Sequence, residues 1–123
     1  MIVDDEAPVA EVLRIILLKA GKDVTMFTSS IAAVTHFRLD LHCCDLVISD
    51  MLMPDMTGAE LAREFLGQRA DIPIIILTGH SENFTRDRVK RSGVKELLLK
   101  PVKQEKLYQV IRKVLEHGKN FSH

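Results

Sequence analysis

Five polar side chains stand at the points where short apolar segments of the sequence end. They are Asp4, Asp5, Asp50, Thr78 and Lys100. A short apolar run bounded by turn residues is typical of a buried strand in a parallel sheet, and ligands bind beyond the carboxyl ends of such strands. Residues 46–50 are the clearest case, because the run ends in Asp50 and is followed by Pro54 and Gly58. An acid at this position is a candidate for chemistry rather than packing.

Three carboxylates at one edge of a sheet would repel one another, since a like-charge pair about 4 Å apart costs about 4 kcal/mol at an effective dielectric near 20. One acid must then take up a proton, or a cation must lie among them. Hard oxygen ligands with room for water suit Mg²⁺, whose remaining positions suit phosphate oxygens. Lys100 and the Thr78 hydroxyl could contact such oxygens. Because a carboxylate can act as a nucleophile and become an aspartyl phosphate, the set predicts phosphoryl chemistry.

Segments typical of strands and of helices alternate along the chain. Strands are expected at 1–3, 24–27, 46–50, 74–78 and 96–99, and helices at 8–20, 29–39, from 58, at 82–92 and at 103–117. This alternation predicts βαβ units with right-handed crossovers. Five strands and five helices fit a flavodoxin-like, doubly wound α/β fold with a parallel sheet of order 2-1-3-4-5. In that order the strands that carry the five polar residues are neighbours, so the polar groups converge on one edge.

Apolar positions at helical spacing predict which side chains of the helices face the core. They include Val12 and Leu17 in the first helix and Ile31 and Phe37 in the second. Gly118 is the expected end of the last helix, because glycine commonly follows a helix.

The composition indicates one domain, residues 1–123, with a core of its own. Seventeen Lys and Arg balance seventeen Asp and Glu, which argues against binding to nucleic acid or to a membrane surface. There is no run of about eighteen apolar residues, and the first residues do not show the basic-then-apolar pattern of a leader. Cys43 and Cys44 are adjacent, which disfavours a disulfide between them, and they lack the spaced partners of a zinc site. We therefore expect two reduced thiols in a cytosolic protein. Residues 1–3 are shorter than a usual strand of about five residues, so we expect part of that strand to be missing.

Four motifs together resemble the receiver domain of two-component response regulators, a bacterial type of phosphorelay signalling. The motifs are residues 3–6 (VDDE), residues 49–58 (SDMLMPDMTG), Thr78 and residues 99–101 (LKP). The resemblance covers almost the whole chain. It implies that Asp50 accepts a phosphoryl group from a histidine of a kinase or phosphotransfer protein, in the cytoplasm.

The resemblance also implies a magnesium site. Mg²⁺ would be held by Asp5, Asp50 and the backbone carbonyl of Leu52, and Asp4 would act through a metal-bound water. No contact with nucleic acid or with a membrane is implied for this domain.

A switch follows from the same resemblance. Thr78 and Lys100 would contact the phosphoryl group and pass the change to the surface formed by residues 82–92, 96–99 and 103–117. A homodimer could form through that surface.

Three positions either depart from the common pattern of receiver domains or are expected to affect how fast phosphate is lost. Leu97 stands where receivers commonly carry Tyr or Phe, so a switch that buries an aromatic ring is not expected. Leu52 and His80 are positions where family members differ in how fast they lose phosphate. Residues 78–82 are similar to receivers fused to hybrid sensor kinases, which suggests a piece of a longer protein.

Three other functions compete with a phosphoacceptor switch. Mg²⁺-dependent phosphatases with an aspartyl-phosphate intermediate resemble one another in a second acid two residues after the nucleophile. In this chain Leu52 occupies that position and cannot transfer a proton. A receiver-like module that signals by binding alone is left open by Leu97. A nucleotide-binding domain is disfavoured, since no glycine-rich loop follows the first strand. We therefore expect a switch rather than an enzyme.

Overall fold

The computed structural model describes residues 1–79 and 90–121, with side chains described as far as residue 116. Five parallel strands form one sheet of order β2-β1-β3-β4-β5. The strands are β1 (Ile2–Val3), β2 (Met26–Phe27), β3 (Val47–Asp50), β4 (Ile74–Thr78) and β5 (Glu96–Leu99). The predicted fold class and strand order are confirmed.

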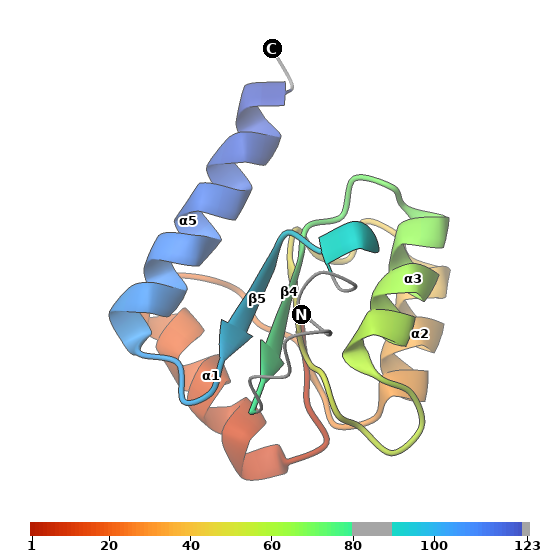
Figure 1. Cartoon of the computed structure of the whole chain (residues 1–123), viewed down its shortest axis with the longest axis horizontal. Helices are drawn as coiled ribbons and strands as arrows, with labels where there is room; N and C mark the ends of the chain where they lie inside the picture. The colour runs from red at the N-terminus through yellow and green to blue at the C-terminus, as the bar shows by residue number, and fades with distance from the viewer. Residues whose placement is uncertain (80–89, 122–123) are drawn as a thin grey trace.

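Four helices have bounds within the described residues. They are α1 (Ala7–Lys19), α2 (Ser30–Leu39), α3 (Gly58–Gln68) and α5 (Gln104–Phe121). The helices α1 and α5 cover one face of the sheet, and α2 and α3 cover the other (Figure 1). The helix predicted at 82–92 lies largely outside the described residues, although residues 90–91 are helical. No helix in the described part of the chain is both long and apolar enough to cross a membrane.

Successive strand residues contribute to opposite layers of the core, as the pleat of a strand requires. In β4, Ile74 and Ile76 pack in the layer of α2 and α3, whereas Ile75 and Leu77 pack in the layer of α1 and α5. Because both faces of the sheet are covered, its strands need apolar side chains on both sides. This explains why the strands read as continuous apolar runs rather than as alternating patterns.

Val12 and Ile31 are among the side chains predicted to face the core that lie on the surface instead. Val12 is 56% exposed and Ile31 is 55% exposed, whereas Leu17 and Phe37 are buried as predicted. Small side chains lie in the core instead in both helices, since Ala10 in α1 and Ala33 in α2 are fully buried. A helix packed on a sheet buries only a narrow stripe of its side chains, so the apolar pattern alone predicted more buried positions than the structure has.

The predicted end of the last helix is also wrong, because α5 continues through Gly118 to Phe121. A glycine inside a helix costs about 1 kcal/mol relative to alanine. That cost is too small to end a helix whose preceding turns are anchored by buried side chains such as Leu107 and Val114.

A capping box fixes the start of α3, close to the end of β3. The Thr57 side chain accepts a hydrogen bond from the Glu60 backbone N–H at 3.1 Å, and the Glu60 side chain accepts one from the Thr57 N–H at 3.0 Å. These bonds satisfy donors that a helix start leaves free. The Gly58 N–H also donates to the Met51 carbonyl at 2.8 Å, so α3 is tied directly to the residue after Asp50.

Candidate functional site

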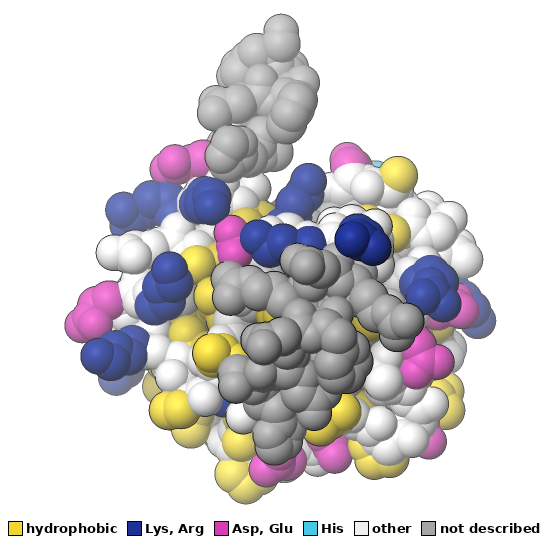
Figure 2. Space-filling model, in the orientation of Figure 1, with side chains coloured by type: hydrophobic (Ala, Val, Ile, Leu, Met, Phe, Trp, Pro, Cys, Tyr) yellow, Lys and Arg dark blue, Asp and Glu magenta, His cyan; other side chains and the backbone are white. Residues whose placement is uncertain are grey.

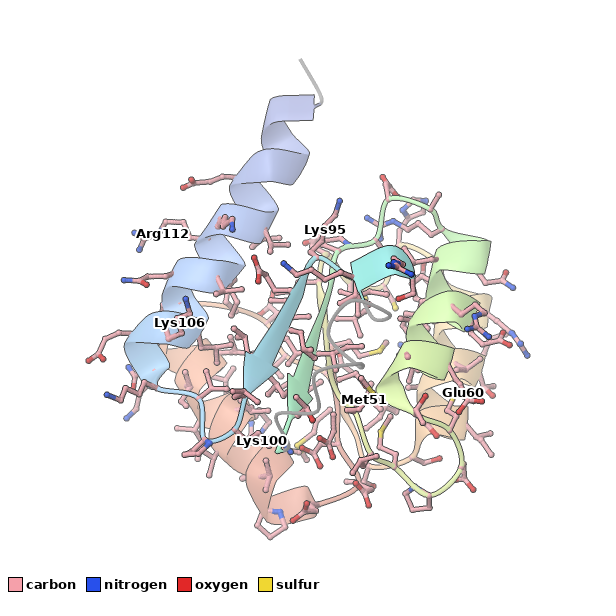
Figure 3. The ribbon with its side chains drawn as sticks, in the orientation of Figure 1. Met51, Glu60, Lys95, Lys100, Lys106 and Arg112 are labelled. Carbon is pink, nitrogen blue, oxygen red and sulfur yellow. The ribbon has the colours of Figure 1, made fainter. Side chains whose placement is uncertain are left out.

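The five predicted residues lie at the carboxyl ends of four adjacent strands. Asp4 and Asp5 follow β1, Asp50 ends β3, Thr78 ends β4 and Lys100 follows β5. Since these strands are parallel neighbours, their carboxyl ends share one edge of the sheet, where Figure 3 shows Lys100. The predicted convergence on one edge is therefore present.

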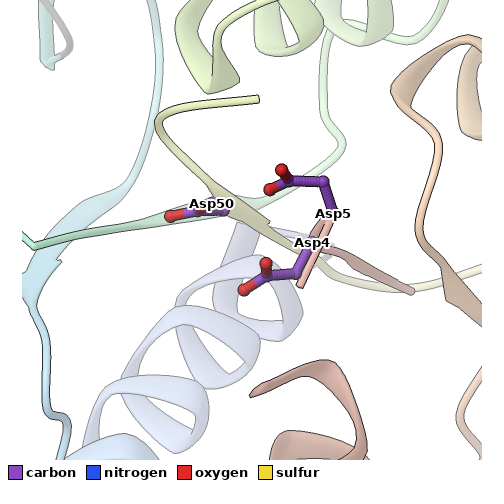
Figure 4. Close-up of side chains that lie close together, drawn as sticks. All are labelled: Asp4, Asp5 and Asp50. Carbon is purple, nitrogen blue, oxygen red and sulfur yellow. The ribbon is translucent and has the colours of Figure 1, made fainter. Parts of the chain in front are cut away.

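The three acids form a compact cluster at this edge. Oxygens of the Asp4, Asp5 and Asp50 carboxylates all lie within 4.8 Å of one another (Figure 4). Asp4 is 1% exposed and Asp50 is 7% exposed, whereas Asp5 lies on the surface. Two buried carboxylates thus face one that is open to solvent.

The Lys100 ammonium lies between the two buried acids. Its Nζ is 3.0 Å from Asp50 Oδ1 and 3.2 Å from Asp4 Oδ2. The repulsion expected from the sequence is thereby offset by a charge from a residue far along the chain. The Lys100 backbone N–H also donates to the Thr78 carbonyl at 2.7 Å, which fixes the start of the loop after β5.

The electrostatics of Asp50 and Lys100 follow from burial and from this pairing. Burial raises the pKa of Asp50, and the Asp4 charge acts in the same direction, while hydrogen bonds from Lys100 and from the Met51 N–H oppose the rise. For Lys100, burial works against the charge, but Asp50 and Asp4 together outweigh it and raise its pKa. A carboxylate with a raised pKa is more basic than an ordinary one, while the lysine beside it stays charged.

The cluster fits a magnesium ion by its chemistry. Mg²⁺ takes oxygen ligands and is usually bound by one or two protein carboxylates while keeping several waters. Asp5 and Asp50 offer carboxylate oxygens within 4.8 Å of each other, and the exposure of Asp5 leaves one side open to water. The residues present could therefore hold this ion.

The remaining predicted residues differ in their surroundings. Thr78 is buried, and the Leu52 side chain is 59% exposed in the loop after β3. Leu97 is buried on β5, opposite Ile76 of β4 and in the core layer of α2 and α3. His80 lies outside the described residues.

Two residues beside Asp50 were missed as parts of the site. The Ser49 hydroxyl donates to the Asp50 carbonyl at 2.9 Å, and the Met51 N–H donates to Asp50 Oδ1 at 3.0 Å.

A Cβ on Gly58 would lie 2.5 Å from the Asp50 carbonyl oxygen. The sequence interpretation used Gly58 as a turn residue after the strand, as the start of a helix and as part of the motif at residues 49–58. A glycine in the segment that follows Asp50 was the only hint in the sequence that two backbone segments pack closely here. That Gly58 packs against the Asp50 carbonyl depends on the fold.

Comparison with known families identifies the family of this chain. Residues 1–112 match the response regulator receiver domain family. The chain belongs to that family. The predicted resemblance is confirmed, and the domain is a receiver of two-component phosphorelay signalling.

Plant response regulators are among the relatives of this receiver domain. It is 32% identical over 127 residues to the two-component response regulator ORR21 of Oryza sativa subsp. indica, a match that covers 100% of this chain and 18% of the relative. With the two-component response regulator ARR10 of Arabidopsis thaliana it shares 33% identity over 117 residues, or 95% of this chain and 21% of the relative. The receiver domain thus spans a small part of these proteins.

Solved receiver structures are closely similar. A response regulator receiver domain protein from Clostridium thermocellum superposes with a TM-score of 0.92 at 28% identity, over 98% of this chain and 95% of that one. The signal receiver domain of a modulated diguanylate cyclase from Desulfovibrio desulfuricans G20 gives a TM-score of 0.81 at 32% identity, over 96% and 93% of the two chains.

Proposed function

We propose that this receiver domain is a phosphoacceptor switch in which Asp50 takes a phosphoryl group from a histidine of a kinase or phosphotransfer protein. The main support is the Lys100 ammonium, 3.0 Å from Asp50 Oδ1, beside a carboxylate whose pKa is raised by burial. An Asp50 oxygen attacks phosphorus, the bond from phosphorus to the histidine nitrogen breaks, and its electron pair leaves with the imidazole. The product is an acyl phosphate.

Lys100 and Thr78 would receive the transferred group. Lys100 lies between Asp50 and Asp4 before transfer, so phosphoryl oxygens arriving on Asp50 would compete with these carboxylates for its ammonium. The Thr78 hydroxyl would donate to another phosphoryl oxygen. These new contacts of Lys100 and Thr78 would then shift the strand ends that carry the two residues.

Asp5, Asp50 and the backbone carbonyl of Leu52 would hold Mg²⁺, with Asp4 acting through a bound water. When bound, the ion supplies positive charge that offsets the charge of the transferring group. Asp4 has a second role in this proposal. Its Oδ1 accepts from the Glu6 N–H at 2.9 Å and its Oδ2 lies 3.2 Å from Lys100 Nζ, so it positions the lysine.

The signal would pass from the site to the surface of residues 82–92, β5 and α5. A hydrogen bond from the Lys100 N–H to the Thr78 carbonyl links the ends of β4 and β5, so movement at either strand end reaches the other. Leu97 is already buried, which disfavours a switch that needs a ring to turn inward at this position. We place the domain in the cytoplasm, with its phosphodonor.

Phosphoryl labelling tests the proposed function. Incubation with phosphoramidate and Mg²⁺ should attach one phosphoryl group per chain, as measured by intact mass, and hydroxylamine should remove it because acyl phosphates are labile. Chelation of Mg²⁺ should prevent labelling. A label that resists hydroxylamine, or no label at millimolar Mg²⁺, would contradict the proposal, and steady turnover of a phosphate ester would indicate a phosphatase.

Replacement of Leu52 by Asn is expected to shorten the phosphoryl lifetime. The Leu52 side chain is 59% exposed in the loop after Asp50 and cannot orient an attacking water, whereas a carboxamide can. One additional hydrogen bond in the transition state, about 1.4 kcal/mol, corresponds to about tenfold faster loss of phosphate. Decay of the labelled protein measures the rate, and Leu39→Asn, at a leucine 84% exposed on α2, is the control. An unchanged or slower decay in Leu52→Asn would refute this role.

A further inference from the structure

The formal charge of zero conceals a strong separation of charge along the chain. Residues 1–89 contain eight basic and fourteen acidic side chains, whereas residues 90–123 contain nine basic and three acidic ones. The two parts therefore carry opposite surpluses of six charges. The overall balance, which argued against an electrostatic binding surface, does not describe the region around β5 and α5.

Five basic side chains from three segments form what we call the basic surface. They are Lys90, Arg91, Lys95, Lys106 and Lys113, and all are exposed. Lys106 and Lys113 are seven residues apart, so they share one side of α5. The Lys113 ammonium lies 3.1 Å from Glu96 Oε1, which places that side of α5 next to β5. In Figure 3, Lys95 lies at the start of β5 and Lys106 lies on the neighbouring α5, and Figure 2 shows basic side chains over this face of the molecule.

The acidic residues of this region do not neutralise the basic surface. The Glu96 side chain is only 15% exposed and is already paired with Lys113. Glu105 and Glu116 share a different side of α5 with Arg112, which points away from β5 in Figure 3. In the part of the chain that the structure describes, the other four basic residues have no acidic partner within ion-pair distance. The ten residues 80–89 add two basic and two acidic side chains, so the surplus does not depend on them.

The charge distribution discriminates among occupants of the basic surface. A symmetric dimer would place the same patch of both copies together, so like charges would face each other across the interface. A long nucleic acid would extend beyond the surface toward a remainder of the chain that carries the acidic surplus. A short acidic segment meets the positive charges without either penalty.

We propose that the basic surface binds an acidic segment of a partner protein, rich in Asp and Glu, and does not form a symmetric dimer. This names the partner chemistry of the surface invoked in the proposed switch. Binding by charge does not itself require Asp50 to be phosphorylated, so its test is separate from the labelling experiment.

Titration of the whole unphosphorylated chain with a fluorescein-labelled, glutamate-rich peptide tests the proposal by anisotropy. Affinity should fall steeply as salt is raised. The double variant Lys95→Glu/Lys106→Glu should bind about tenfold more weakly, since two attractions become repulsions. The double variant Lys19→Glu/Lys22→Glu makes the same change in net charge at exposed lysines of the α1 end and should stay within about twofold of the parent.

Four results would overturn this proposal. They are no binding of the peptide at low salt, equal weakening in both double variants, tighter binding of a short DNA duplex than of the peptide, and a dimer in sedimentation that Lys95→Glu/Lys106→Glu dissociates. Loss of peptide binding with intact labelling of Asp50 would refute only the basic surface. Intact peptide binding without labelling would refute only the phosphoacceptor.

Discussion

Asp50→Asn is expected to abolish phosphoryl labelling while the domain stays folded. Asparagine has no carboxylate to attack phosphorus. Its side chain has the shape of aspartate, so its oxygen still accepts the hydrogen bond from the Met51 N–H, which lies 3.0 Å from Asp50 Oδ1 in the structure. Burial raises the pKa of Asp50, so its ionised form, present above that pKa, costs the folded state free energy. Removing the charge should therefore preserve or increase the free energy of unfolding at neutral pH, while Lys100 keeps Asp4 as a partner.

Asp55→Asn is the matched control for labelling. Asp55 is an exposed acid in the same loop, five residues further along, and its replacement makes the same change in charge. Intact mass after treatment with phosphoramidate and Mg²⁺ should show a full label in Asp55→Asn and none in Asp50→Asn. Labelling that persists in Asp50→Asn, with a hydroxylamine-sensitive bond, would mean that another carboxylate is the acceptor. Urea unfolding of both variants separates loss of chemistry from loss of fold.

The positions of the strands were predictable from local patterns, and the convergence of the site followed once the strand order of a known fold class was adopted. Apolar runs that end in polar residues mark the strand ends, and the bounds of β4 and β5 agree with those expected from residues 74–78 and 96–99. Once the parallel order is given, the polar ends must share an edge. No distance between elements enters that argument.

Features that depend on distances between remote segments were not predictable. The position of Lys100 between Asp4 and Asp50 joins residues 96 apart in the sequence, and sequence reasoning gave the lysine only a phosphoryl partner. The burial of Ala10 in place of Val12 depends on how closely α1 approaches the sheet. The sequence shows a basic run at residues 86–91. Which other charges share a surface with Lys90 and Arg91 depends on the fold, since a net charge is a sum that says nothing about where charges lie.

Gly58→Ala is expected to destabilise the domain by about 3 kcal/mol or more, at the upper end of overpacking effects. A Cβ at this position would lie 2.5 Å from the Asp50 carbonyl oxygen and 3.2 Å from both the Asp50 carbonyl carbon and the Met51 Cα. All three atoms belong to the backbone, so no side chain can rotate away. The clash is resolved only if the start of α3 and the end of β3 move apart, against the hydrogen bond from the Gly58 N–H to the Met51 carbonyl.

Gly67→Ala in the same helix is the matched control, and it is expected to have the opposite sign. No atom lies within 4 Å of a Cβ built on Gly67, so alanine gains helix propensity of up to about 1 kcal/mol without a clash. Urea unfolding should therefore move the midpoint down for Gly58→Ala and up for Gly67→Ala. Because the movement at Gly58 displaces the Asp50 backbone, the folded fraction of Gly58→Ala should also label more slowly. Equal shifts in both variants would show that α3 does not press on the end of β3 and that Gly58 acts only through helix propensity.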